Sequence, residues 1–454
     1  MEQPITPHPA VTAAATPSPA SAVPTPVWTN SQRILFRFAV SWFLLYIFFN
    51  PNGILPGVDE TYNFYITPFH RLIPWLGLHI LHLAHPITTF TNGSGDTTYD
   101  YVTLLLIGFL AILTAAIWTL LDRKRTSYAT LFYWVTTILR YYLGVTMLTY
   151  GFAKIFKMQF PSASLFRLLE PYGDSTPMGL AWTYMGYSIG YNLFTGFAEV
   201  IAGSLLFFRK TTAIGAFLAF IVSANIAAMN YSFDIPVKLL STTMILMSLF
   251  LLGGNIRRLF RLFFLGRATQ LIIVPRPPIR KKAVRITLVV VKSLLLLYVF
   301  LGTASDSVEL RHKYGDHAPH TPLYGIYNTT SFLYNNETLA AIQTDTIRWK
   351  QLVIDGSQAY AFGGIKMMND SIHRYRIKTD TTARLLTITD FADTTKNWRL
   401  HYSYPLTDTL TLWGTRSRGN KADSIRVALA RYPLSNFRLN SRGFNWINEF
   451  PYNR

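Results

Sequence analysis

The sequence predicts an all-α polytopic membrane bundle of about seven spans, followed by a C-terminal antiparallel β domain. Half of the 454 residues are hydrophobic and only 14% are charged, and the mean hydropathy is positive. The chain contains seven apolar stretches that each approach the roughly 20 residues a helix needs to cross a bilayer. After Gly302 the pattern changes to short alternating runs separated by turn residues, which is typical of strands.

Composition also excludes several classes of chemistry. The chain has no cysteine, so disulfides, thiol catalysis, iron–sulfur clusters and cysteine-ligated zinc are excluded. The net charge of +19 is compatible with nucleic-acid binding, but most basic residues border apolar stretches. We therefore expect the lipid bilayer, and no nucleic acid, as a partner. The sequence shows no Gly-rich phosphate loop, serine-nucleophile motif or zinc-protease motif.

The chain divides into five parts. Residues 1–30 are rich in Pro, Ala and Thr and lack the features of a signal peptide, so we expect a disordered tail. Residues 31–127 hold two spans and an apolar segment (67–87), interrupted by Pro74 and four histidines, that we expect to form an interfacial or re-entrant helix. The remaining parts are a four-span core at 128–253, a basic loop and last span at 254–302, and the β domain at 303–454. The spans are placed at about 33–50, 101–121, 128–157, 182–208, 211–230, 236–253 and 285–302.

Basic residues indicate the orientation. With seven spans, four separate basic groups fall on the same side of the membrane, which predicts that this side is cytoplasmic. The alternate loops carry acidic residues. We therefore expect a bacterial inner-membrane protein with a cytoplasmic N-terminus and a periplasmic or extracellular β domain. The basic groups are Arg33 and Arg37; Arg123, Lys124 and Arg125; Arg209 and Lys210; and nine Arg or Lys residues between 257 and 285.

The tail predicts seven or more strands around one core. About 130 residues suffice to bury a single core, and many short strands with regular turns favour a sandwich or a small barrel. The opening LYGIYNTTSF, followed by a meander, is similar to lipocalin-like barrels. The strand-like runs are TIRWKQLVI, AYAFGGIKM, SIHRYRIKT, RLLTIT, WRLHYSY, DTLTLWG and SIRVALARY.

Ionisable residues inside the predicted spans are the strongest functional signal, because such residues are costly in a membrane. Arg140 and Glu199 fall at similar depths on antiparallel spans, so we expect them to pair, with Asn225 completing the network. Lys154 lies about 21 Å further out on the helix of Arg140. Near Lys154 we expect a ligand-binding group of Tyr150, Tyr187, Tyr191, Asp234 and Lys238, with Tyr184 and Asn230 at a similar depth.

Two interpretations of these charges stay open. The Arg140–Glu199 pair either locks helix packing or takes part in function. Lys154 either serves a ligand or extends its ammonium to the interface as an anchor.

The motifs RYYLGVTMLTYGFAKIF (140–156) and FTGFAEVIAGSLLFFRKTTAIGAFLAF (194–220) resemble the DoxX family of small bacterial membrane proteins. The shared features are an Arg-led helix that ends in Gly-x-x-Lys, here Gly151 and Lys154, and a helix in which Glu199 precedes small residues. The resemblance covers about residues 130–253. It implies a four-helix membrane core and, for some members, quinone-coupled oxidation or a response to oxidative stress. The extra spans and the β tail depart from the short family form.

The chain is also similar to the transmembrane domain of vitamin K-dependent carboxylases, which carries a Tyr-rich span ending in Gly-x-x-Lys before a β-rich lumenal region. Gly151 and Lys154 alone transfer from that motif. This resemblance implies that Lys154 is a catalytic base acting on a quinone-like ring.

Two groups of histidines and one loop are further candidates for a functional role. His79, His82 and His85 repeat a helical spacing that suits a metal or haem, and His312, His317 and His320 form a second group just beyond the last span. In both cases a solvated or interfacial segment is the alternative. The loop 161–182 is expected to form a short helix and turn that either cover a pocket or merely connect two spans.

Three functions follow from these observations. The leading hypothesis is a redox-associated membrane subunit that binds a quinone or similar lipid near Lys154. The second is a non-enzymatic scaffold whose β domain binds a protein or lipid partner. The third is a membrane enzyme that uses Lys154 as a base, so the sequence leaves open whether the chain is an enzyme. An apolar cavity that reaches Lys154 would favour the first or third hypothesis.

Overall fold

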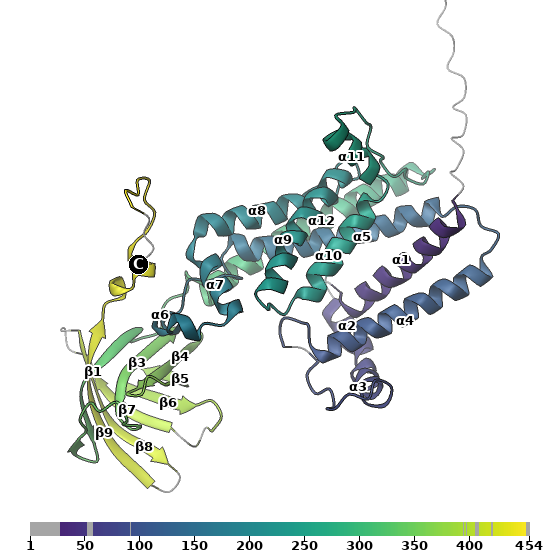
Figure 1. The fold of residues 1–454 in the computed structure, drawn as a ribbon. Coiled ribbons are helices and arrows are strands. Elements are labelled where there is room, and N and C mark those ends of the chain that lie inside the picture. The colour runs from purple at the N-terminus through teal and green to yellow at the C-terminus, as the bar shows by residue number, and fades with distance from the viewer. Residues whose placement is uncertain are drawn as a thin grey trace, which may run out of the picture.

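The computed structural model describes residues 28–450 except 52–57, 91, 394, 396, 405–407 and 419–420. Residues 1–27, and with them nearly all of the predicted disordered tail, lie outside the described residues. The helices form a bundle, and a β-barrel lies beyond one end of it (Figure 1). The helices are α1 (Asn30–Phe49), α2 (Val58–Ile66), α3 (Phe69–His79), α4 (Thr98–Leu121), α5 (Ala129–Ile155), α6 (Leu165–Leu169), α7 (Pro177–Tyr187), α8 (Ile189–Leu206), α9 (Thr212–Ser232), α10 (Lys238–Leu252), α11 (Ile256–Leu265), α12 (Lys282–Lys313) and α13 (Arg438–Ser441).

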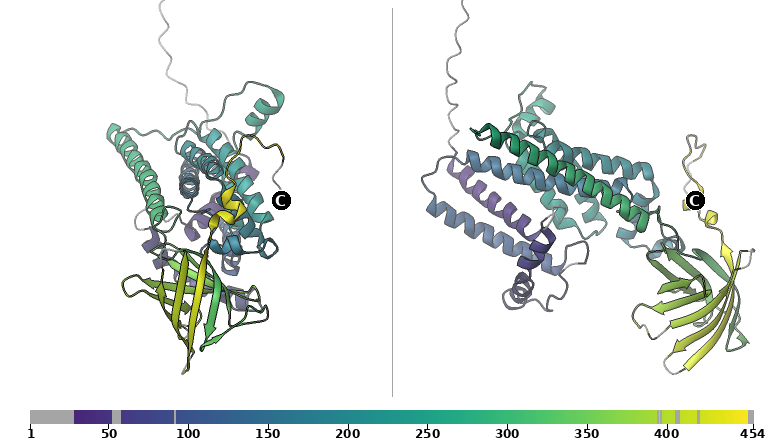
Figure 2. Two further views of the ribbon diagram at one scale, coloured as in Figure 1. Left: turned by 90° about the vertical axis from the view of Figure 1, so that its left-hand side faces the viewer. Right: turned by 180° about the vertical axis from the view of Figure 1, so that it is seen from behind.

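Five of the described helices are long and apolar enough to cross a membrane: α1, α4, α8, α9 and α12. A sixth span results if α10 and α11 count as one, although they meet at 84°. α5 is 27 residues long but carries Arg140 and Lys154, and it is not among these apolar helices. It runs beside α8 in every view (Figures 1 and 2). A helical membrane protein is therefore supported, whereas the count of seven spans stays a prediction.

Two boundaries differ from the predicted spans. The fourth span was expected at 182–208, but the helix is interrupted at Ser188, whose side chain caps α8 by accepting a hydrogen bond from the backbone N–H of Tyr191. The last span was expected to end at Gly302, but α12 continues to Lys313. The extra turns carry polar residues such as Asp306 and Glu309, which do not stop a helix once it leaves an apolar environment.

Small residues bring α5 and α8 into close contact. A Cβ atom on Gly151 would lie 2.7 Å from the Val200 side chain, and one on Gly196 would lie 2.8 Å from the Gly151 carbonyl oxygen. Gly144 and Gly203 make the same close approach seven residues away. Packing of small residues is a principal source of helix association in membranes, where the hydrophobic effect contributes little between helices. These glycines fix the register of α5 against α8.

The C-terminal domain is an eight-stranded antiparallel barrel. Its strands pair in sequence order from β3 to β9, and β1 closes the ring by pairing with both β3 and β9, while the short β2 extends β1. The rings of Trp349 and Trp398 meet edge to face among aliphatic residues in the barrel core, with their centres 5.1 Å apart. The strands are β1 (Gly325–Tyr334), β2 (Glu337–Thr338), β3 (Trp349–Gly356), β4 (Ala361–Met367), β5 (Ile372–Asp380), β6 (Leu385–Asp390), β7 (Asn397–Ser403), β8 (Thr409–Arg418) and β9 (Lys421–Tyr432).

The structure confirms the predicted β domain, and it shows that this domain is a barrel and not a sandwich. Each of the seven predicted runs overlaps one strand from β3 to β9. Closure removes the exposed strand edges that an open sheet would leave. The domain begins about 20 residues later than expected, because α12 occupies the chain up to Lys313.

The junction between bundle and barrel is polar and specific. Lys157 Nζ lies 2.8 Å from an Asp316 carboxylate oxygen, and the same carboxylate accepts hydrogen bonds from Ser162. α6 then packs on the barrel: the Leu165 N–H donates to Asp355 at 2.8 Å, and Phe166 stacks on Phe362. The predicted short helix in loop 161–182 is thus present, and it docks the barrel.

Candidate functional site

A buried ion pair joins α5 to α8. Lys154 Nζ donates to both carboxylate oxygens of Glu199, at 2.8 and 2.9 Å. The two side chains are only 5% and 2% exposed. Because water is excluded, neither charge has an alternative partner of comparable strength, and removing one would leave the other buried and uncompensated.

The predicted pairing of Arg140 with Glu199 is wrong. Gly144 lies against Gly203, so continuing that register by four residues places Arg140 beside Phe207 rather than Glu199. Arg140 Nε in fact donates to the Leu206 carbonyl at 2.7 Å. Eight residues of helix separate Phe207 from Glu199, which corresponds to about 12 Å. The depth estimate failed because it counted from the ends of apolar stretches, whereas glycine contacts set the register.

A small cavity of about 50 Å³ lies beside the Lys154–Glu199 pair. Its walls are mostly apolar and aromatic, and Lys154 Nζ lies 5.8 Å from the centre of the Tyr150 ring and 5.9 Å from that of Phe160. The polar exceptions include Asn230 and Ser241, which hydrogen-bond to each other at 3.1 Å. The lining residues are Tyr150, Lys154, Gln159, Phe160, Trp182, Glu199, Ile226, Met229, Asn230, Ile235, Val237, Leu240, Ser241 and Met244. An apolar cavity therefore reaches Lys154, as the ligand-binding hypothesis requires.

Of the predicted neighbours of Lys154, Tyr150 and Asn230 line the cavity. Tyr187 and Tyr191 are exposed on α7 and α8 and do not line it. Asp234 and Lys238 pair with each other at 2.9 Å and do not line the cavity either. Asn225 is exposed on α9 and is not among the hydrogen-bond partners that Arg140 and Glu199 have within the described residues. These corrections have one cause: depth along a helix can be estimated from sequence, but the direction of each side chain around the axis depends on packing.

Sequence reasoning missed Phe160, Trp182 and Ser241 as cavity residues. Phe160 follows the end of α5, and its ring meets Trp182 of α7 edge to face at 5.0 Å. Nothing in their local pattern separates these residues from ordinary core positions. Asn230 was expected near Lys154 from its depth after the fifth span, and it does line the cavity.

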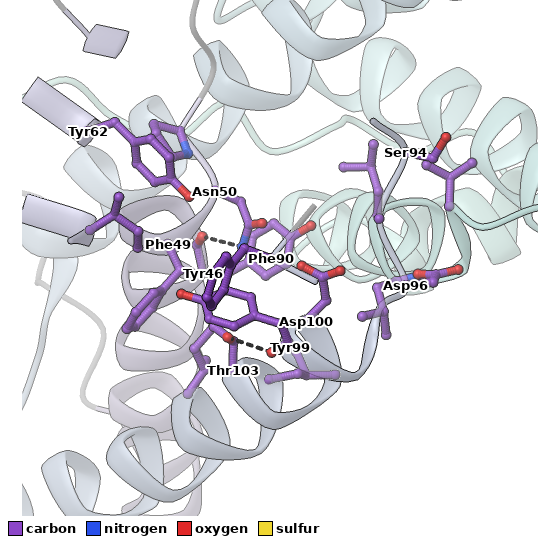
Figure 3. Close-up of a pocket in the computed structure, with 18 of the residues that line it drawn as sticks. Tyr46, Phe49, Asn50, Tyr62, Phe90, Ser94, Asp96, Tyr99, Asp100 and Thr103 are labelled. Atoms are coloured by element: carbon purple, nitrogen blue, oxygen red, sulfur yellow. Dashed lines mark hydrogen bonds between the residues drawn. The ribbon is translucent and has the colours of Figure 1, made fainter. Parts of the chain in front are cut away.

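A larger pocket of about 510 Å³ adjoins the small cavity. It lies among the ends of α1, α2, α4 and α10 and contains several aromatic and acidic side chains (Figure 3). One of these, Asp96, accepts hydrogen bonds from the N–H groups of Lys238 and Leu239 and so caps α10. Tyr150, Val237 and Leu240 line both spaces, so these three residues form the partition between the pocket and the ion pair.

The histidine groups do not assemble into a metal site among the described residues, in which no three His, Asp or Glu side chains gather closely enough to hold an ion. Trp75 lies 5.3 Å from His79, ring to ring. His320 stacks on Tyr324, whereas the His317 ring bonds Arg311 at 2.8 Å. Metal binding by either group thus gains no support.

The fold and site define a class: a polytopic helical membrane protein with an attached β-barrel, in which a buried lysine–glutamate pair faces an apolar cavity. By sequence, the chain belongs to the same family as the uncharacterized protein YwoB of Bacillus subtilis (strain 168), to which it is 34% identical over 133 residues, or 27% of this chain and 79% of YwoB. No family model and no solved structure matches the chain. The name of this relative states no activity, so the resemblances to DoxX proteins and carboxylases stay predictions.

Proposed function

We propose that this protein is a redox-associated membrane subunit that binds a quinone or a similar lipid beside Lys154. The observation that carries the proposal is the buried Lys154–Glu199 pair at an apolar cavity. A lysine ammonium has three N–H donors, and the contacts to Glu199 leave at least one of them for the carbonyl or hydroxyl oxygen of a ligand.

The size of the two spaces indicates where such a ligand would lie. A volume of about 50 Å³ accommodates one or two water molecules, which is too little for a substituted ring. The adjoining pocket of about 510 Å³ falls in the range of small-molecule sites. We therefore place the ring in the larger pocket, with one oxygen reaching Lys154 when the Tyr150 side chain moves aside.

The geometry favours a donor role for Lys154 over the alternative role of a catalytic base. Removing the lysine proton would leave the Glu199 carboxylate buried without a positive partner 2.8 Å away. A base would need a second group to neutralise Glu199 at the same time, and no other ion pair to Glu199 exists within the described part of the chain.

The test is mass spectrometry of quinones and lipids that copurify in mild detergent, combined with titration of a short-chain quinone. Lys154→Ala should abolish binding, and Lys154→Arg should restore it only partly, because the guanidinium is bulkier. Lys157→Ala is the matched control, since Lys157 is three residues away and faces Asp316 instead of the cavity. If Lys154→Ala misfolds, Lys154→Met combined with Glu199→Leu removes both charges together. Unchanged ligand content in these variants would refute the proposal.

A scaffold is the second candidate, and the bundle–barrel junction favours it. The Lys157–Asp316 contact and the docking of α6 hold the barrel in a defined position. Side chains occupy the barrel core, so a partner would bind its outer surface. This hypothesis takes the lead if the wild-type protein carries no quinone or lipid ligand.

We also propose the orientation given by the basic residues, in the bacterial inner membrane. A reporter fused after Arg454 should be active only outside the cytoplasm, and one fused after Arg125 only inside. The loop that joins α4 to α5, which contains the basic residues 123–125, and the helix α11 lie at the end of the bundle away from the barrel, which agrees with this orientation (Figure 1). Activity of the Arg454 fusion in the cytoplasm would overturn it.

A further inference from the structure

Arg140 is a buried cation that the Lys154 site does not use. It is 6% exposed, lies on α5, and makes one hydrogen bond, from Nε to the Leu206 carbonyl. A guanidinium has five N–H donors, so the other four have no acceptor among the residues that the structure describes. Leaving so many donors of a buried cation unused is costly, and such a group normally finds an anion or a carbonyl.

Two more cations lie at the same end of α8, and one of them lines the same cavity as Arg140. Lys292 of α12 donates to the Phe207 carbonyl at 2.6 Å, one residue beyond the acceptor of Arg140. Arg209 lies two residues further on and shares with Arg140 the lining of a small cavity of about 20 Å³. No carboxylate pairs with any of the three within the described residues. The group therefore carries three positive charges without a counter-charge.

Capping of α8 explains only part of this arrangement. The carbonyl groups at the end of a helix attract cations, and Arg140 and Lys292 satisfy two of them. Within the described residues, Arg209 makes a long 3.4 Å contact with the Val274 carbonyl and no other hydrogen bond. Among the other polar residues of the cavity, Asn255 bonds the backbone of Ile272, and the Thr136 and Thr212 hydroxyls donate to carbonyls of the preceding turn. The charged donors that face the cavity belong to the two arginines, beside the Tyr133 hydroxyl, and their positive charge favours an anion as the ligand.

We propose that Arg140 and Arg209, which line one cavity, bind one phosphate group, and that Lys292 adds a positive charge nearby without lining that cavity. The phosphate group is either the headgroup phosphate of an anionic phospholipid or free phosphate. Arginine forms bidentate hydrogen bonds with phosphate oxygens, and lysine supplies a point charge. The cavity of about 20 Å³ has room for a single oxygen atom beside the two arginines, so the other oxygens of a bound phosphate group would lie outside it.

The position of this site favours a lipid headgroup over free phosphate as the source of the phosphate group. The site lies at the turn between α8 and α9, where these two apolar helices end, and lipid headgroups lie at the ends of membrane-spanning helices. The adjacent α11 is amphipathic: Phe260, Phe263 and Phe264 are exposed, and Arg257, Arg258 and Arg261 belong to the same helix. The stretch from 257 to 285 contains nine basic and no acidic residues, and such segments attract anionic membrane surfaces.

The experiment measures phosphate-group binding with two probes. Purified full-length protein is reconstituted in phosphatidylcholine nanodiscs with and without phosphatidylglycerol, and bound phosphatidylglycerol is counted by native mass spectrometry. Inorganic phosphate is titrated separately against thermal stability in detergent. Binding of phosphatidylglycerol alone identifies a headgroup site, and stabilisation by inorganic phosphate as well identifies a site for the free ion.

Variants then locate the site. Arg140→Gln and Arg209→Gln should each weaken binding about tenfold or more, since each removes charge-assisted hydrogen bonds. Arg280→Gln removes the same charge from an exposed position in the linker before α12 and should leave affinity nearly unchanged. If Arg140→Gln fails to fold, Arg209→Gln carries the test, because Arg209 is only partly buried. Equal losses in Arg209→Gln and Arg280→Gln, or wild-type binding in Arg209→Gln, would overturn the proposal.

Discussion

Replacement of Glu199 by glutamine should destabilise the bundle strongly. The charges of Lys154 and Glu199 are 2.8 Å apart, and their attraction at an effective dielectric constant of 20 is about 6 kcal/mol. Part of this is recovered, because the glutamine oxygen still accepts a hydrogen bond from Lys154. Breaking a buried pair from one side typically costs about 3–5 kcal/mol, and we expect a loss of unfolding free energy in that range.

The assay is equilibrium unfolding in mixed micelles, followed by circular dichroism, for Glu199→Gln, Lys154→Met and their combination. The combination should lose less than the sum of the single losses, because it leaves no stranded charge. Asp234→Asn is the control: it breaks an ion pair with Lys238 in which the carboxylate is 86% exposed, so it should change stability little. Additive losses, or equal losses in Glu199→Gln and Asp234→Asn, would refute the account of the pair as a buried, coupled unit.

Two further predictions concern the packing and the junction. Gly151→Ala should destabilise the bundle by about 1–3 kcal/mol, because the new methyl group would lie 2.7 Å from the Val200 side chain. Gly302→Ala is the control and should not destabilise the bundle, because no atom lies within 4 Å of the new methyl group. The melting temperatures of the two variants are compared with that of the wild type. At the junction, burial opposes ionisation of Asp316, but hydrogen bonds from Lys157 and Ser162 outweigh it and lower the pKa of the carboxyl. The stabilisation is thus complete above about pH 4 and is lost as pH falls through the lowered pKa. Asp316→Asn should release the barrel at neutral pH, which would be seen as faster proteolysis between α12 and β1. The variant should also lose the increase in proteolysis that the wild type shows as pH falls through the pKa of Asp316. A variant with the same proteolysis rates as the wild type at every pH would contradict this.

The sequence predicted the architecture well, because that architecture rests on patterns that need no partner. The length and hydropathy of an apolar stretch are enough to predict a membrane helix. The helices α1, α4, α9 and α12 lie where such stretches predicted them. The strands from β3 to β9 follow from two-residue alternation and turn residues, which are local properties. The barrel was one of two open alternatives, and the long-range pairing of β1 with β9 decided between them.

The sequence also marked the charged residues as important, since ionisable groups are rare in apolar helices. Lys154, Glu199 and Arg140 were all singled out. The pairing was wrong, because charge and approximate depth do not reveal which faces of two helices meet. Tyr187 and Tyr191 failed as ligand residues for the same reason: their depth suited Lys154, but their side chains are exposed.

The sequence by itself determined the main apolar helices, the strands from β3 to β9 and the charges that enter the membrane domain, because these properties depend on local composition. Only the tertiary structure decided that Lys154, and not Arg140, meets Glu199. The close contact of Gly144 with Gly203, and of Gly151 with Gly196, sets the register of α5 against α8. A shift of that register by two turns would exchange the partners, and no single segment contains the information to exclude the shift. The partner of a buried charge is therefore a property of helix packing.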